Sequence, residues 1–140
     1  MRNLTKSKKR IVVVFGIFDG IHDGHRNFFA QAKEHGDELV AIVGRDLASL
    51  RLKKKQPKHS EGERLNFVLQ DQNVDLAVLG DEEQSSYNVL EGLSPNVICF
   101  GYDQTDLVKD VQIWMQKTGK NISLRQLDAY RPEKYHNSIL

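Results

Sequence analysis

Residues 11–25 read IVVVFGIFDGIHDGH, and this stretch decides the fold of the 140-residue chain. Its first five residues are apolar, mostly β-branched and without alternation, which predicts a strand buried on both faces of a parallel sheet. The glycines at 16, 20 and 24 predict a turn that leads into a helix. Unpaired N–H groups and the helix dipole favour an anion at such a helix start, where Gly24 would let a phosphate approach the backbone.

Two histidines, His22 and His25, lie one helical turn apart at this predicted anion site. Such a pair suits phosphoryl or nucleotidyl transfer, in which the protein mainly positions phosphates and neutralises charge. Near its ordinary pKa of roughly 6.5, imidazole can be cationic or can donate a hydrogen bond while neutral. Two alternatives are histidines that only cap a helix and a zinc site, although no carboxylate or cysteine at metal-ligand spacing accompanies the pair.

The same residues resemble the signature of the cytidylyltransferase-like nucleotidyltransferase superfamily. Its HxGH motif matches residues 22–25, and the FD that precedes the motif matches residues 18–19. The resemblance implies that His22 and His25 are catalytic. It also implies that the nucleotide is bound by Gly16, Ile17, Phe18, Asp19 and Gly24.

The rest of the chain alternates between apolar runs and helical patterns, with strands predicted at residues 11–15, 39–43, 76–79, 97–100 and 122–127. Helices are predicted near residues 24–35, after the Ser60 and Glu63 capping box, around 87–93 and up to Gly119. Gly36 is expected to end the first helix in the left-handed conformation. The pattern predicts a Rossmann-like, doubly wound α/β fold, a five-stranded parallel sheet with helices on both faces.

Composition indicates one enzyme domain over residues 1–140, with a basic tail at residues 1–10. Hydrophobic residues make up 39% of the chain and charged residues 28%, with a formal net charge of +1. This balance gives little support to nucleic-acid binding. Cys99, the one cysteine, lies in an apolar run and is predicted to be a small buried hydrophobe. Without a membrane-length apolar run or a signal peptide, a cytoplasmic location and no membrane partner are expected.

Polar residues follow the predicted strands, at the edge where a parallel sheet binds its ligands. After the fourth strand comes Gly101-Tyr102-Asp103-Gln104, which resembles the GYDQ segment of archaeal-type FAD synthases. The resemblance implies that these four residues contact the nucleotide. It assigns substrate binding to Arg45 and Asp46, which follow the second strand, and to Arg64 in the second predicted helix. Polar loops without a function are the alternative.

A basic loop and a short motif near the end complete the candidate site. Five cations lie between Arg51 and Lys58, and relatives carry a phosphate-binding lysine there, so Lys53 or Lys54 is expected to be catalytic. A solvated charge run is the alternative. Ser138 matches a serine or threonine that meets the terminal phosphates at a helix start in the family, and is assigned to the nucleotide.

Together these features predict a nucleotidyltransferase that transfers AMP or CMP from ATP or CTP, with Mg²⁺, to a phosphorylated acceptor and releases pyrophosphate. The GYDQ segment favours FMN as the acceptor. A CTP-dependent enzyme acting on a polyol or amino-alcohol phosphate is the alternative. A nucleotide-binding sensor without catalysis is an alternative of another class. Relatives are commonly dimers, so the resemblance implies a homodimer whose other partners are its small-molecule substrates.

Overall fold

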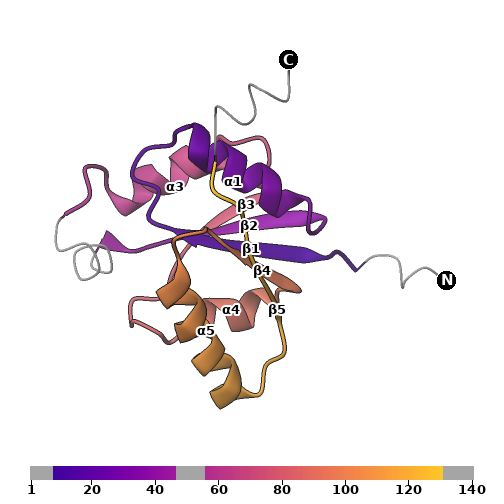
Figure 1. Cartoon of the computed structure of the whole chain (residues 1–140). Helices are drawn as coiled ribbons and strands as arrows, with labels where there is room; N and C mark the ends of the chain where they lie inside the picture. The colour runs from indigo at the N-terminus through magenta and orange to yellow at the C-terminus, as the bar shows by residue number, and fades with distance from the viewer. Residues whose placement is uncertain (1–7, 47–55, 131–140) are drawn as a thin grey trace.

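The computed structural model describes residues 8–46 and 56–130. In chain order, the described elements are β1 (Ile11–Gly16), α1 (Asp23–Lys33), β2 (Glu38–Val43), α3 (Glu61–Leu69), β3 (Leu76–Leu79), α4 (Asn88–Leu93), β4 (Val97–Phe100), α5 (Thr105–Thr118) and β5 (Ser123–Gln126). The strands form one parallel sheet in the order β3-β2-β1-β4-β5. This arrangement confirms the predicted Rossmann-like α/β fold (Figure 1).

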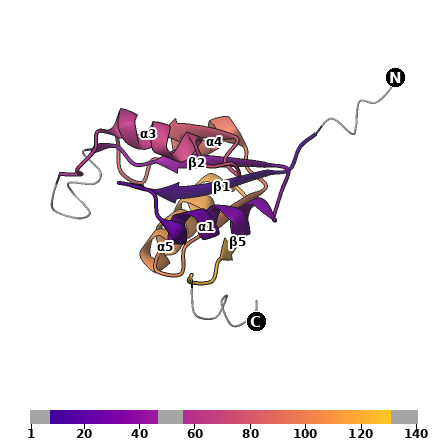
Figure 2. The same ribbon diagram turned by 90° about the horizontal axis from the view of Figure 1, so that it is seen from above.

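Helices cover both faces of the sheet. Helices α1 and α3 lie on one face, and α4 and α5 lie on the other (Figure 1). In Figure 2, which looks down on the first face, α1 and α3 lie on either side of β1. Strand β1 is central, and its residues Val12, Val13 and Val14 are fully buried. As predicted, the apolar run is unbroken because both faces of this strand are covered.

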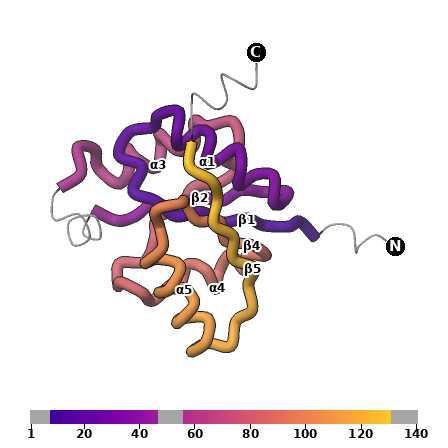
Figure 3. The backbone as a smooth tube through the Cα atoms, in the orientation of Figure 1, coloured from indigo at the N-terminus to yellow at the C-terminus, as the bar shows by residue number. Residues whose placement is uncertain are grey.

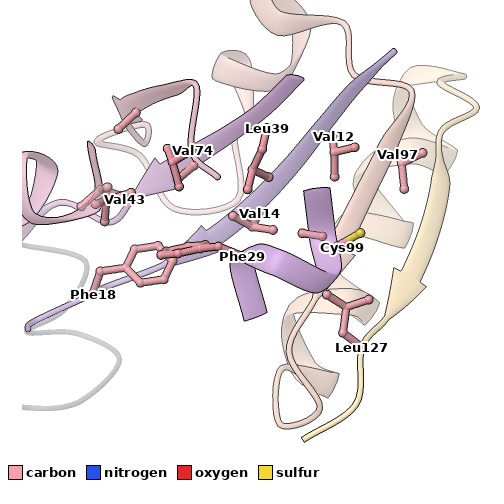
Figure 4. Close-up of a cluster of buried hydrophobic side chains, with 14 residues drawn as sticks. Val12, Val14, Phe18, Phe29, Leu39, Val43, Val74, Val97, Cys99 and Leu127 are labelled. Carbon is pink, nitrogen blue, oxygen red and sulfur yellow. The ribbon is translucent and has the colours of Figure 1, made fainter. Parts of the chain in front are cut away.

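Two apolar clusters fill the spaces between the sheet and its helices. The first lies under α1 and α3 and includes Phe18, Phe29 and Val68; Figure 4 shows most of its side chains. The second lies under α4 and α5 and includes Leu90, Val111 and Trp114. The side of α5 that carries Val111 and Trp114 is thus part of the core. Cys99 is fully buried in the first cluster, which also agrees with the sequence.

The two glycines expected to end helices behave differently. Helix α5 ends at Gly119, as predicted, and this glycine has φ +73°, the left-handed conformation. The prediction for Gly36 is wrong, because α1 ends earlier, at Lys33, and Gly36 does not have a positive φ. A side chain is excluded at Gly36 by close packing instead, since a Cβ there would lie 2.7 Å from the backbone oxygen of Arg10.

The strand order places a topological switch point at β1. From β1 the chain passes through α1 to β2 on one side, whereas β4 pairs with β1 on the other side. Loops that leave the carboxyl ends of β1 and β4 therefore diverge, and ligands of doubly wound sheets bind in such a crevice. The chain after β5 runs back to α1 (Figure 3). There Gln31 donates to the backbone oxygen of Asp128 at 3.1 Å and accepts from its N–H at 3.2 Å.

Candidate active site

The turn after β1 begins α1 with two histidines that cap the helix reciprocally. The Nδ1 of His22 accepts a hydrogen bond from the Gly24 N–H at 3.0 Å. The Nδ1 of His25 accepts from the His22 N–H at 3.2 Å. The two rings stack, with centroids 3.9 Å apart. Because both Nδ1 atoms accept, each neutral ring carries its hydrogen on Nε2 and is a donor there.

Neighbouring residues give this turn its shape. A Cβ at Gly24 would lie 2.9 Å from the Cε1 of His22, so the stacked ring needs glycine there. Phe18 has φ +56° and returns its ring to the core, where it lies edge-on to His25 with centroids 5.5 Å apart. A Cβ at Gly16 would lie 2.4 Å from that ring. The Phe18 side chain therefore packs against His25 from the core. Because that side chain is buried, mainly the backbone of Phe18 can contact a nucleotide.

Arg64 is the one buried charged side chain among the residues that the structure describes, with 0% of its surface exposed. Its Nη1 donates to the backbone oxygens of Ile17 at 2.7 Å and Gly44 at 2.8 Å. Its Nη2 donates to the Asp46 carboxylate at 2.6 Å, and its Nε donates to the backbone oxygen of His59 at 3.1 Å. The guanidinium thus joins the histidine turn, the end of β2 and the segment before α3.

This placement differs from the expectation that Arg64 binds substrate. A fully buried side chain has no surface to offer to a ligand, so in this structure Arg64 holds the loops that surround the site. The sequence could not reveal this burial, because three of the four acceptors of Arg64 are backbone carbonyls, two of them in segments 20 and 47 residues away. Asp46, which was also expected at the substrate, is the ion-pair partner of Arg64.

Arg45 connects the end of β2 to the elements beside it. Its Nε donates to the backbone oxygen of Gly80 at 2.8 Å, and its Nη1 lies 3.4 Å from the Glu61 carboxylate. Glu61 also accepts from the Asp46 N–H at 2.9 Å. About a third of the Arg45 side chain is exposed. Arg45 therefore stays a candidate for binding substrate, in addition to its structural contacts.

Asp19 makes its contacts with the segment before α3. Its carboxylate accepts from the backbone N–H groups of Lys58 at 2.7 Å and His59 at 3.0 Å, and the His59 Nδ1 also lies 3.0 Å from it. The Lys58 N–H is the largest influence on the pKa of Asp19, and together with His59 it holds that pKa below the usual range despite desolvation. An ionised Asp19 therefore anchors the chain that returns from the basic loop. The sequence did not single out His59, since only the folded chain brings it to Asp19.

The loop after β4 is held by two glutamine side chains. The Gln104 Oε1 accepts from the Gly101 N–H at 2.7 Å, and its Nε2 donates to the backbone oxygen of Phe15 at 3.0 Å. Gln126 in β5 donates to the backbone oxygens of Gly101 and Tyr102, both at 3.1 Å. Gln104 thus joins the ends of β1 and β4 across the switch point. The Tyr102 side chain is left 62% exposed beside this crevice.

Some predicted features lie outside the described residues, namely Lys53, Lys54 and Ser138. Within residues 8–46 and 56–130, no group of three or more His, Cys, Asp or Glu side chains is placed to hold a metal ion. The helices in those ranges are all too short or too polar to span a bilayer. Tyr130, the last described residue, brings its Cβ to 4.0 Å from the position of a Cβ on Gly24, so the chain after β5 reaches the histidine turn.

The fold and the histidine-capped turn define a nucleotidyltransferase, and comparison with known proteins agrees. A profile described as cytidylyltransferase-like matches residues 13–139. The chain therefore belongs to the cytidylyltransferase-like family. It is 38% identical to the FAD synthase of Thermococcus sibiricus over 93% of this chain and 88% of that protein. It is 35% identical to the FAD synthase of Thermoplasma acidophilum over 85% of this chain and 82% of that protein.

Solved structures agree on the fold. The lipopolysaccharide core biosynthesis protein of Thermoplasma volcanium superposes with a TM-score of 0.80 at 31% identity, covering 89% of this chain and 100% of that one. Pantoate-beta-alanine ligase of Francisella tularensis superposes with a TM-score of 0.64 at 12% identity, over 89% of this chain and 61% of that one. The second likeness concerns the fold alone.

Proposed function

We propose that this chain is an FMN adenylyltransferase that uses ATP. An oxygen of the FMN phosphate attacks the α-phosphorus of ATP, the bond from that phosphorus to the oxygen bridging to the β-phosphate breaks, and pyrophosphate leaves. Support for the substrates comes from relatives named FAD synthase, which match over most of the chain. Support for the chemistry comes from the reciprocal histidine cap at the start of α1.

The histidine cap is the observation that carries the proposal. With both Nδ1 atoms accepting from backbone N–H groups, the Nε2–H groups are the donors that His22 and His25 can direct at phosphate oxygens. Charge grows on those oxygens in the transition state, and donors already in position stabilise it without reorganising. The acceptor phosphate is itself the nucleophile, so no side chain has to form a covalent intermediate.

The remaining predicted contacts are arranged around this turn in the proposal. The nucleotide lies between the turn and the loop after β4, against the backbone of residues 16–19 and Gly24 and against residues 101–104. Residues Arg45, Lys53, Lys54 and Ser138 meet phosphates. Mg²⁺ enters with ATP as part of the substrate, since phosphate oxygens and water supply most of its ligands in nucleotide sites. Arg64 and Asp46 hold the loops in place rather than binding a substrate.

The proposal also covers the assembly and location of the enzyme. We infer a homodimer, as the family resemblance implies, and a location in the cytoplasm, where nucleoside triphosphates are made and used. Sedimentation of the purified chain tests the first inference, and fractionation of cells tests the second.

The experiment that tests the function crosses two nucleotides with two acceptors. Purified enzyme with Mg²⁺ receives ATP or CTP together with FMN or glycerol 3-phosphate, and both pyrophosphate and the joined product are measured. We expect FAD from ATP and FMN, and a loss of about 10²–10³ in kcat for His25→Ala, as for the removal of one transition-state donor. Turnover only with CTP would instead favour the cytidylyltransferase that the family's description suggests.

A further inference from the structure

Beside the histidine turn lies a pocket of about 370 Å³ between α1 and α3, in the size range of small-molecule sites. Its lining combines the apolar side chains of Ile21 and Phe67 with the polar side chains of Arg26, His59, Gln70 and Asp71. None of its lining residues comes from β4 or from the loop after it. The pocket is therefore separate from the crevice in which the proposed function places the nucleotide.

The His59 ring is held in a defined orientation at this pocket. Its Nδ1 faces the Asp19 carboxylate at 3.0 Å, and because an ionised carboxylate only accepts, the hydrogen lies on Nδ1. Its plane stands nearly perpendicular to the Phe67 ring, at 85°, with centroids 4.9 Å apart. A carboxylate that orients an imidazole from behind is typical of side chains positioned to meet a ligand. The Nε2 of His59 is the polar atom left for that contact.

The pocket adjoins the first turn of α1. Two of its lining residues, Gly20 and Ile21, directly precede His22, and Arg26 follows His25. The Arg26 guanidinium is held by Asp23 at 2.8 Å, and more than half of that side chain is exposed. A ligand that fills the pocket can thus extend a phosphate toward the helix start, where N–H groups and the dipole favour an anion.

We propose that this pocket binds the isoalloxazine ring of the acceptor FMN. The inference rests on the proposed function and adds to it the place of the second substrate. The isoalloxazine ring is planar, with apolar edges and several carbonyl and nitrogen atoms. Its apolar parts can pack on Ile21 and Phe67, and its polar atoms can form hydrogen bonds with His59 and Gln70. Arg26 then meets the acceptor phosphate. FMN then approaches the histidines from the α3 side, and ATP approaches them from the β4 side.

A bulky side chain at the pocket tests the inference, with a matched control on the same helix. Gln70→Trp fills the pocket from the end of α3, whereas Asn66→Trp places the same side chain at an exposed position of α3 that does not line it. FMN binding without ATP is followed by flavin fluorescence, and KM is measured separately for FMN and ATP. We expect Gln70→Trp to weaken FMN binding and raise the KM for FMN at least tenfold, with the KM for ATP unchanged. Asn66→Trp should behave as the wild type.

The outcomes separate this inference from the proposed function. If the wild type makes FAD and Gln70→Trp binds FMN as well as Asn66→Trp does, the pocket is not the flavin site and the function stands. Equal loss in both tryptophan variants would also overturn the inference, because the loss would not be specific to the pocket. If the wild type neither binds FMN nor makes FAD, both proposals fail together. His59→Asn provides a second test, in which we expect an increased KM for FMN and an unchanged KM for ATP.

Discussion

Replacing Arg64 with methionine removes the buried guanidinium while keeping an unbranched side chain that fills the space of the aliphatic stem. The change leaves the Asp46 carboxylate without its cation and three backbone oxygens without their donor, those of Ile17, Gly44 and His59. Breaking a buried ion pair from one side costs about 3–5 kcal/mol. Asp46 is about a third exposed, and water can reach it, so we expect the lower part of that range, about 3 kcal/mol.

Urea unfolding measures this loss directly. A loss of about 3 kcal/mol is a large part of the roughly 5–15 kcal/mol that stabilises an ordinary domain, so the midpoint should fall clearly while the slope m stays unchanged. Arg64→Lys should recover little of it, because one ammonium group cannot reproduce the fork of donors that reaches four acceptors. Asp46→Asn should cost less in the Arg64→Met background than in the wild type, since the two side chains interact. A loss below about 1 kcal/mol for Arg64→Met would refute the reasoning.

Three further predictions concern the pH dependence of stability, a buried thiol and the histidine cap. Burial raises the pKa of Asp75, but the hydrogen bonds from Lys33 and the Leu39 N–H outweigh it and leave the pKa below its usual value. The stabilisation by this carboxylate is therefore complete above about pH 4–5 and is lost as the pH falls through the folded-state pKa. In urea unfolding, the wild type should have a larger free energy of unfolding than Asp75→Asn at pH 7 but not at pH 2. An equal difference at both pH values would contradict this. Burial raises the pKa of Cys99 to about 11, so a thiol reagent at pH 8 should label it only after unfolding; rapid labelling of the native protein would argue against a closed core. Asparagine is a good N-cap, so His22→Asn should keep stability within about 0.5 kcal/mol of the wild type, whereas His22→Ala should lose about 1 kcal/mol in urea unfolding. Both variants should lose catalysis to a similar extent in the pyrophosphate assay, and retention of the rate by either would remove His22 from the chemistry.

The sequence predicts the parts of this fold that depend on neighbours along the chain. The unbroken apolar run of β1, the capping box at Ser60 and the end of α5 at Gly119 are all local patterns, and the structure has them where expected. Gly36 shows the limit of such reasoning. Glycine after a helical pattern usually ends the helix, but here the missing Cβ makes room for the backbone oxygen of Arg10 in another segment.

The candidate site was predictable as a set of segments but not as a set of contacts. Arg64 and Ile17 are 47 positions apart, and Gln104 and Phe15 are 89 apart, yet each pair is hydrogen-bonded in the folded chain. Their acceptors are backbone carbonyls, which exist at every position and so leave no pattern in the sequence. A polar residue after a strand therefore predicts proximity to the crevice, whereas its hydrogen-bond partner can be identified only in the folded structure.

These contacts divide the predicted site residues into two groups. Arg64, Asp19 and Gln104 use their side-chain polar atoms within the protein, and each joins the turn after β1, or the strand itself, to another segment. His22 and His25 each accept a backbone hydrogen bond at Nδ1 in the cap, which sets the direction of Nε2. Transition-state stabilisation depends on donors that are already oriented, and orientation requires a rigid support. Arg64, Asp19 and Gln104 are therefore as necessary to the proposed chemistry as the histidines, because they hold the segments around the turn that orients the histidines.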